Sequence, residues 1–216
     1  IIDRRDSMHR GCPDDSGIYH DPAQHVFLGH RRLALIDLSP AGHQPMSEAT
    51  GRLQIVYNGE IYNFKEINSE LISLGRSFHS LSDTEVILQS YLQWGTNCFD
   101  RFNGMFSFAI WDNQEKTLFA ARDRFGVKPF HYARHQEAFY FSSEIKALWA
   151  AGIPKVPCEQ VWAGYLAYGT YGLPNETFWE GIQQLPAGHY LEWENNSIHI
   201  TQWYDFVGRI KLLPIL

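Results

Sequence analysis

The first third of the chain alternates short apolar runs with turn residues. Three runs rich in β-branched and other apolar residues predict strands; they are His25–Gly29, Leu33–Asp37 and Leu53–Tyr57. The pair Asn58-Gly59 follows the third run directly, and an Asn-Gly pair is among the strongest short turn signals. We therefore expect a strand that ends at Tyr57 and a turn at Asn58 and Gly59.

Two segments in the middle of the chain show helical periodicity with start and stop signals. In both, apolar residues recur three or four positions apart, a capping pair precedes them and a glycine follows. The first predicted helix is Asn63–Leu74, with Asn63 and Glu66 as the capping pair and Gly75 as the stop. The second is Asp83–Trp94, with Ser82 and Glu85 as the capping pair and Gly95 as the stop.

The second half of the chain predicts further short strands and helices. They are strands Met105–Trp111, Thr117–Arg122 and Ala138–Ser142, helices Ser143–Ala151 and Cys158–Tyr168, and a hairpin of His189–Glu194 and Ser197–Thr201 through Asn195-Asn196. Short turns between successive strands favour antiparallel sheets, because parallel strands need long crossovers. Helices grouped between runs of strands favour an α+β fold over a doubly wound parallel sheet.

Composition and charge narrow the classes of protein. The chain has 216 residues, 44% of them hydrophobic and 19% charged, which suits one large globular domain. The net charge is −6, and no Lys/Arg-rich run is present, so there is no electrostatic case for nucleic acid or an anionic membrane. No apolar stretch is long enough to cross a bilayer. Nothing in the composition calls for a cofactor in this chain.

The cysteine and histidine patterns give no redox or metal site. Cys12, Cys98 and Cys158 are odd in number and widely spaced, which is not a disulfide framework. A reducing, cytoplasmic compartment is therefore the default. The ten histidines lack Cys or carboxylate partners at ligand spacing. His131 and His135 have helical ligand spacing but lie in a segment that we expect to be turn-rich, so we predict no metal site.

A few polar residues stand where a binding site could form. Arg32 can hold a carboxylate in a bidentate fork. The Asn58 amide and the Gly59 backbone N–H are two donors of the kind an oxyanion needs during acyl transfer. Glu60 and Asp83 can hold an ammonium group. Together these groups would complement an amino acid with a side-chain carbonyl.

Each of these residues also has an ordinary structural interpretation. An Asn-Gly pair by itself is structural in about nine cases of ten. Asp83 is favoured at a helix N-terminus by the helix dipole, and Arg32 can simply pack on the surface. The pattern alone does not establish an amino-acid site.

A set of motifs in one order adds a resemblance to a known family. The motifs are His9–Gly11, Pro13–Gly17, His30–Asp37, Gln44-Pro45, Asn58–Asn63, Ser82–Leu88, Asn103–Ala109, Ala121–Pro129 and Ser142–Leu148. From Met8 to about Phe206 the chain resembles the class II glutamine amidotransferase domain at the start of asparagine synthetases. The form Glu60-Ile61-Tyr62 is more similar to asparagine synthetases than to the sugar-phosphate or purine-pathway amidotransferases.

The resemblance implies a fold and a role for each candidate residue. The fold would be a four-layer αββα sandwich, two antiparallel sheets between helix layers, as in N-terminal-nucleophile (Ntn) hydrolases. Arg32 would bind the α-carboxylate of glutamine, and Glu60 and Asp83 its α-amino group. Asn58 and Gly59 would form the oxyanion hole. Residues 1–206 would form this domain, and residues 207–216 an atypical tail or the start of a linker.

The resemblance also implies a nucleophile that this sequence does not contain. The family uses an N-terminal cysteine, whose thiolate attacks the glutamine carboxamide with its own α-amine as base. The sequence starts at Ile1, after the expected first strand and cysteine, and Cys12 interrupts the His-Arg-Gly-Pro-Asp motif. We therefore expect a fragment that does not release ammonia from glutamine by itself.

The resemblance also implies a second domain in the parent protein, and two alternative functions stay open. The resemblance implies a missing C-terminal synthetase domain that uses ATP and Mg to activate aspartate, and it leaves a homodimer open. One alternative is a related amidotransferase of a polysaccharide or peptide-modification pathway. Another is a module that binds glutamine without cleaving it.

Overall fold

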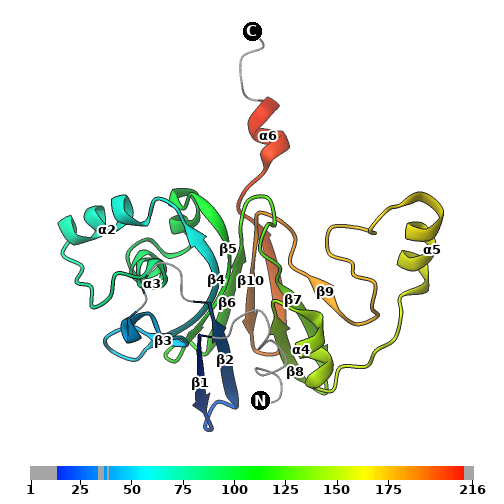
Figure 1. Cartoon of the computed structure of the whole chain (residues 1–216), viewed down its shortest axis with the longest axis horizontal. Helices are drawn as coiled ribbons and strands as arrows, with labels where there is room; N and C mark the ends of the chain where they lie inside the picture. Colours follow the sequence, from blue (N-terminus) through cyan, green and yellow to red (C-terminus); the bar gives the residue numbers. More distant parts are fainter. Residues whose placement is uncertain (1–13, 34–36, 38, 212–216) are drawn as a thin grey trace.

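A six-stranded antiparallel sheet forms the centre of the molecule (Figure 1). The computed structural model describes residues 14–33, 37 and 39–211. The strand order is β11-β10-β6-β5-β4-β3. The strands are β3 (Met46–Ser47), β4 (Leu53–Ile61), β5 (Gly104–Asp112), β6 (Thr117–Arg122), β10 (His189–Glu194) and β11 (Ser197–Gln202). The longest pairing joins β4 to β5, from Leu53 opposite Asp112 to Ile61 opposite Gly104.

A second β layer covers one face of this sheet and is made of two separate pieces. One piece has the order β8-β7-β9, and the other is the pair β1-β2. The strands are β1 (Asp15–Asp21), β2 (Val26–Arg32), β7 (His131–His135), β8 (Ala138–Ser142) and β9 (Gln183–Gln184). Within the described residues, β2 pairs only with β1 and β8 only with β7.

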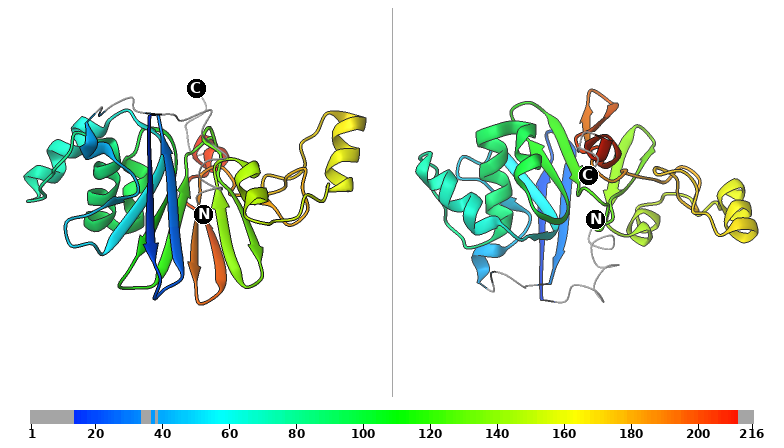
Figure 2. Two further views of the ribbon diagram at one scale, coloured as in Figure 1. Left: turned by 60° about the horizontal axis from the view of Figure 1, so that its bottom comes forward. Right: turned by 90° about the horizontal axis from the view of Figure 1, so that it is seen from above.

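Helices lie on the outer side of each β layer (Figure 2). Helices α2 and α3 cover the six-stranded sheet, and α4 packs against β7 and β8. The helices are α2 (Phe64–Ser73), α3 (Asp83–Trp94), α4 (Ile145–Ala150), α5 (Glu159–Tyr168) and α6 (Phe206–Lys211), with short 3₁₀ turns η1 (Pro40–Gly42) and η2 (Gly95–Arg101). No helix in the described part of the chain is long and apolar enough to cross a membrane.

The central strands are buried on both faces, and this creates two apolar cores. In β5, Phe106, Phe108 and Ile110 pack toward α2 and α3, whereas Ala109 and Trp111 pack toward the second β layer. Successive strand residues point to opposite faces, so each strand supplies both cores. This is why the sequence of this strand does not alternate cleanly between apolar and polar residues. The expected four-layer αββα sandwich of two antiparallel β layers is the observed architecture.

The helix layers differ in how much apolar surface they bury. The core under α2 and α3 is large, while α4 covers a small cluster that includes Ala133 and Leu148. Helix α5 projects from the sandwich and buries only Val161, whereas Leu166 and Tyr168 are exposed.

The predicted helices are confirmed, but one capping prediction is wrong. Helix α3 has the predicted bounds, and the Ser82 hydroxyl accepts a hydrogen bond from the Thr84 N–H at 3.2 Å. Asn63 makes no side-chain cap on α2. Its amide instead donates to the Arg101 carbonyl at 2.9 Å and accepts the Asn103 N–H at 2.9 Å. A long-range contact therefore replaces the local capping box predicted from spacing.

The turn predicted at Asn58 and Gly59 is wrong. Both residues lie inside β4, opposite Ser107 and Phe106 of β5. Pairing with β5 over nine residues outweighs the local turn preference, because β propensity depends strongly on the partner strand. The strand predicted at His25–Gly29 likewise extends to Arg32.

Other differences from the prediction are smaller. Leu33 and Asp37 are not in a strand, and residues 34–36 of that predicted strand lie outside the described residues. His131 and His135 form the two ends of β7, so their segment is not turn-rich. The described residues contain no group of three His, Cys, Asp or Glu residues placed to hold a metal ion. The hairpin turn is confirmed, with positive φ angles at Asn195 and Asn196.

Candidate functional site

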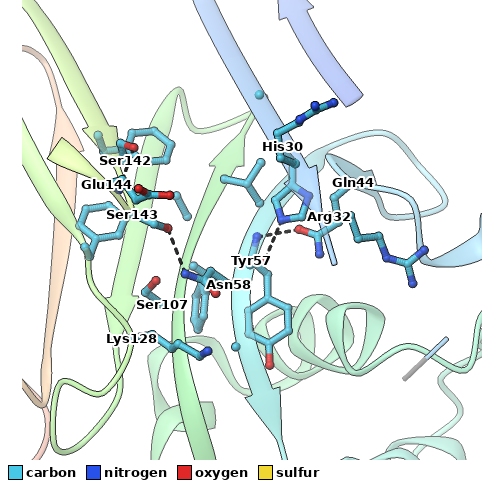
Figure 3. A pocket seen from close by; sticks show the side chains of 18 of the residues that line it. His30, Arg32, Gln44, Tyr57, Asn58, Ser107, Lys128, Ser142, Ser143 and Glu144 are labelled. Atoms are coloured by element: carbon cyan, nitrogen blue, oxygen red, sulfur yellow. Dashed lines mark hydrogen bonds between the residues drawn. The ribbon is translucent and has the colours of Figure 1, made fainter. Parts of the chain in front are cut away.

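One cavity of about 470 Å³ lies between the two pieces of the second β layer (Figure 3). Its walls come from β2 on one side and from β8 and α4 on the other, and β4 and β5 form its floor. The edges of β2 and β8 that pair with no other described strand thus lie on either side of one hollow.

Four of the five predicted site residues line this cavity. They are Arg32 of β2, Asn58 and Gly59 of β4, and Asp83 at the start of α3. Glu60 does not line it, although its charge acts on Asp83. The structure therefore brings together residues that are up to 51 positions apart in sequence (83 − 32), and it places Glu60 at the margin.

The outer edge of β4 carries a row of backbone groups, most of which have partners. The Tyr57 N–H donates to Gln44 Oε1 at 2.7 Å, and the Tyr57 carbonyl lies 2.9 Å from His30 Nε2. Four residues further along β4, the Ile61 N–H donates to Asp83 Oδ2 at 3.0 Å. These groups belong to alternate residues, so they point to the same side of the strand, away from β5.

The Gly59 N–H is the open position in this row. It lies midway between Tyr57 and Ile61 and by the same alternation points to the free edge. No described residue accepts a hydrogen bond from it. A strand edge with one unused N–H between two capped ones is a ready position for a ligand oxygen.

Only glycine fits at position 59. A Cβ atom there would lie 2.2 Å from the Met105 carbonyl oxygen and 2.7 Å from Phe106 Cα. The two strands approach closely at this point, so any side chain would push β4 away from β5.

Asn58 adds a second donor beside the Gly59 N–H. Its side chain reaches across to the second β layer, where Nδ2 donates to the Ser143 hydroxyl at 3.1 Å (Figure 3). A carboxamide has two N–H groups, so one stays available for another acceptor. Neighbouring side-chain and backbone donors of this kind suit an oxyanion.

Asp83 is a buried carboxylate without a cationic partner among the described residues. It accepts hydrogen bonds from the Tyr57 hydroxyl at 2.8 Å and from the Ile61 N–H. Burial raises the pKa of its carboxyl group, and the Glu60 charge adds to this effect. A buried acid that lacks a counter-charge is suited to receive an ammonium group from a ligand.

Arg32 is held by the backbone of the segment that follows β2. Its guanidinium donates to the Ser39 carbonyl at 3.3 Å and to the Asp37 carbonyl. The η1 turn packs closely on it, since a Cβ at Gly42 would lie 2.1 Å from Nη2. Arginine has five N–H donors, so these contacts orient the group and leave donors for a carboxylate.

Three further residues at the site had no role assigned from sequence. His30, Gln44 and Ser143 all lie in the motifs that carry the family resemblance, but nothing local to them indicates a contact with β4. Burial lowers the pKa of His30 to about 4, so its ring is neutral at pH 7. Its Nδ1 atom is buried and has no partner in the described part of the chain.

No described cysteine reaches the cavity. Cys98 is fully buried under α3, where burial raises the pKa of its thiol. Cys158 precedes α5 and does not line the cavity. Cys12 lies outside the described residues.

The fold and the strand-edge donors together define the class of protein. Two antiparallel β layers between helices, with a cavity at the edge of a central strand, are the Ntn-hydrolase-like architecture. The chain belongs to the glutamine amidotransferase domain family, whose sequence profile matches residues 3–204.

Curated relatives and a solved structure agree with this assignment. Asparagine synthetase [glutamine-hydrolyzing] 3 of Bacillus subtilis is 37% identical over 93% of this chain and 33% of its own length. Asparagine synthetase [glutamine-hydrolyzing] 1 of the same organism is 42% identical over 67% of this chain and 22% of its own length. Amidase chry2 of Gibberella zeae is 36% identical over 85% of this chain and 26% of its own length. The chain thus spans a third or less of each of these relatives.

The structural similarity concerns the fold alone. Glutamine phosphoribosylpyrophosphate amidotransferase from B. subtilis superposes with a TM-score of 0.60 at 20% identity, over 82% of this chain and 34% of that chain.

Proposed function

We propose that this domain binds glutamine in the cavity beside β4 and supplies the oxyanion hole for hydrolysis of its carboxamide. The observation that carries the proposal is the open Gly59 N–H next to the Asn58 amide, at a strand edge whose neighbouring groups are capped. Membership of the glutamine amidotransferase domain family supports the choice of substrate.

Charge complementarity orients the substrate in this proposal. Arg32 binds the α-carboxylate, because its guanidinium is held in place and has donors to spare. Asp83 binds the α-ammonium, whose charge offsets the burial of this acid. Glu60 adds a second negative charge from the margin of the cavity. The side-chain carboxamide then points toward Asn58 and Gly59.

The reaction proceeds through a thioester. A cysteine thiolate attacks the carboxamide carbon, and the carbonyl oxygen becomes an oxyanion that accepts hydrogen bonds from Asn58 Nδ2 and the Gly59 N–H. The α-amine of the cysteine, which took the proton of the thiol, passes it to the nitrogen as the C–N bond breaks, and ammonia leaves. Water then attacks the thioester carbon and releases glutamate and the thiol. The nucleophile is the N-terminal cysteine that the family resemblance implies.

The proposal for the whole protein goes further. We assign it as a glutamine-dependent asparagine synthetase of the cytoplasm, in which a second domain uses ATP and Mg to activate aspartate and takes up the ammonia. Two of the reported relatives carry that name. The amidase relative keeps another amidotransferase reaction as the alternative, and a glutamine-binding module without catalysis is the second alternative. A homodimer would be tested by analytical ultracentrifugation.

The central experiment is Asn58→Ala in the full-length protein with its N-terminal cysteine. Loss of one oxyanion donor lowers kcat by about 10²–10³-fold, with little change in KM. Asn68→Ala, in α2 and away from the cavity, is the matched control. Glutamate release measured at saturating glutamine tests the proposal, and an unchanged kcat in Asn58→Ala would overturn it.

A second experiment tests the source of the nucleophile. We expect the 216-residue polypeptide to release no ammonia from glutamine, and a version extended to the N-terminal cysteine to release it. Turnover in the 216-residue polypeptide that disappears on Cys12→Ser would contradict this expectation.

A further inference from the structure

The amide of Asn58 is held by a residue from the opposite β layer. Asn58 lies on β4 in the six-stranded sheet, and its Nδ2 donates to the hydroxyl of Ser143 at 3.1 Å, 85 residues along the chain. Ser143 follows β8 and precedes α4. Figure 3 shows the two side chains meeting across the cavity. No other described partner of the Asn58 side chain is present.

Ser143 is itself fixed by its surroundings. Its carbonyl oxygen lies 3.1 Å from Nδ1 of His131 in β7. A carbonyl oxygen can only accept, so Nδ1 carries the proton of this contact. Burial lowers the pKa of His131. On the next residue, the Glu144 N–H donates to the Ser142 hydroxyl at 3.1 Å. These two contacts hold the peptide group between Ser143 and Glu144 in place, next to the Ser143 side chain.

An oxyanion donor must be oriented as well as present. The carboxamide of asparagine turns about a soft terminal torsion, and half a turn would present its oxygen in place of its N–H groups. The Ser143 hydroxyl occupies one N–H and so restrains rotation of the amide plane. A hydroxyl can accept or donate, and in the orientation that the structure shows it accepts and leaves the second N–H for the substrate. The Gly59 N–H needs no such support, because the pairing of β4 with β5 fixes its direction.

We propose that Ser143 is a positioning residue of the oxyanion hole, which acts on the reaction through Asn58 and does not touch the substrate. The proposal rests on the proposed function, since it assigns Asn58 the role of oxyanion donor. It also gives the second β layer a part in the chemistry, because the strand pair β7–β8 carries the anchor for a catalytic group of β4.

The alternative is that Ser143 only joins the two β layers. In that case, replacing Ser143 by alanine would lower the stability of the domain but would have no specific effect on kcat. Kinetics that separate binding from the chemical step, and a cycle with Asn58, distinguish these two roles.

The experiment uses the full-length protein with its N-terminal cysteine and compares Ser143→Ala, Ser143→Thr, Asn58→Ala and the double variant. Loss of one neutral hydrogen bond in the transition state predicts a kcat about three- to tenfold lower in Ser143→Ala, with an unchanged KM for glutamine. Ser143→Thr keeps the hydroxyl and restores the rate. In the Asn58→Ala background, Ser143→Ala has no further effect on kcat. Ser197→Ala at the exposed start of β11 is the control.

A second readout measures binding to the oxyanion hole directly. The γ-aldehyde analogue of glutamate adds to the thiol and places an oxygen where the oxyanion forms. Ser143→Ala should weaken the binding of this aldehyde by the same factor as kcat and leave the binding of glutamate unchanged. If Ser143→Ala does not fold, Ser143→Cys replaces it, because a thiol is only a weak acceptor.

The outcomes separate the two proposals. A normal kcat in Ser143→Ala together with a low kcat in Asn58→Ala overturns the positioning role and leaves the proposed function intact. A Ser143→Ala effect that persists in full in the Asn58→Ala background also overturns the positioning role. A normal kcat in Asn58→Ala overturns the proposed function itself.

Discussion

The two ends of the β4–β5 strand pair differ in how far their polar groups are satisfied. At the end where Leu53 faces Asp112, Arg52 donates to Asp112 through Nε at 3.0 Å and through Nη2 at 2.6 Å. Glu48 accepts the Arg52 N–H at 2.7 Å, and Asn113 donates its N–H to the Arg52 carbonyl at 2.8 Å. Arg52 and Asp112 pair with each other, and Glu48 is held by the Thr50 hydroxyl and by backbone N–H groups. These polar groups only hold the strand ends together.

The other end of the same strand pair carries polar groups that have no partner among the described residues. Asp83 is buried without a cation among the described residues, and the Gly59 N–H has no described acceptor. His30 Nδ1 is buried and has no hydrogen-bond partner among the residues that the structure describes. Polar groups without hydrogen-bond partners in a protein interior cost free energy. Their accumulation at one end of the strand pair therefore indicates a place where a ligand would supply the missing partners.

The largest expected effect comes from adding a side chain at Gly59. Gly59→Ala places a Cβ against the Met105 carbonyl and separates β4 from β5, which should lower the free energy of unfolding by about 3 kcal/mol and abolish glutamine hydrolysis. Gly164→Ala, in the interior of α5, places its Cβ 3.1 Å from Thr170 Oγ1 and should change stability by less than about 1 kcal/mol. Urea denaturation measures both, and equal effects would mean that β4 can shift without cost.

The next largest effect concerns the end of the β4–β5 strand pair at Asp112, where the polar groups have partners. Asp112→Asn removes a charge that receives Arg52 and two backbone N–H groups, so stability at pH 7 should fall by about 1.5–3 kcal/mol. Burial pushes the pKa of Asp112 upward, but these hydrogen bonds outweigh it and the pKa lies below 3.8. The contribution is therefore present above pH 3.8 and is lost as the pH falls through the lowered pKa. Unfolding curves from pH 7 to pH 2 should show wild type and variant converging in acid.

At the site end, Arg32→Lys should weaken glutamine binding. A lysine keeps the charge but cannot make a bidentate fork to a carboxylate while also holding the Ser39 carbonyl. The expected loss is about 1.5–3 kcal/mol of binding free energy. Calorimetry on a protein whose nucleophilic cysteine is replaced by alanine measures it, with Arg134→Lys on the exposed side of β7 as the control. Unchanged affinity would remove Arg32 from the site.

The smallest expected effect has the opposite sign to that of Asp112→Asn. Burial raises the pKa of Asp83 above 3.8, so the folded protein binds this proton more tightly than the unfolded chain. The ionised carboxylate thus opposes folding at neutral pH, and this penalty vanishes as the pH falls below 3.8. Asp83→Asn should raise stability at pH 7 by about 0.5–1 kcal/mol and weaken glutamine binding. A destabilised variant at pH 7 would show that Asp83 is a structural charge like Asp112.

The elements that the sequence predicted well are those with local causes. Helix α3 begins at the Ser82 cap and ends at Gly95, which has a positive φ of 55°. The β10–β11 hairpin turns at two asparagines with positive φ. Caps and tight turns depend on the few residues within them, so these two signals survive in the folded chain. The local signals at Asn63 and at Asn58-Gly59 fail because contacts with distant segments replace them.

Residue chemistry made the site residues candidates, only the family resemblance assigned them roles, and their geometry could not be predicted. Residue pattern alone left Asn58 and Gly59 as a turn, because a local signal cannot register a partner strand that begins more than 40 residues later at Gly104. No local pattern pointed to Ser143 as the partner of Asn58, since 85 residues separate them.

The amino-acid sequence by itself therefore determined the chemical groups of this domain, the two ends of α3, the turn between β10 and β11, and an antiparallel α+β architecture. Tertiary structure alone decided that Asn58 and Gly59 lie in a strand, that Gly59 faces an open edge, and that Asp83 stays buried without a described counter-charge. The physical reason is that strand register and burial arise from contacts between distant segments. The same N–H, amide or carboxylate can be a satisfied structural group or a reserved binding group, depending on which segment lies opposite.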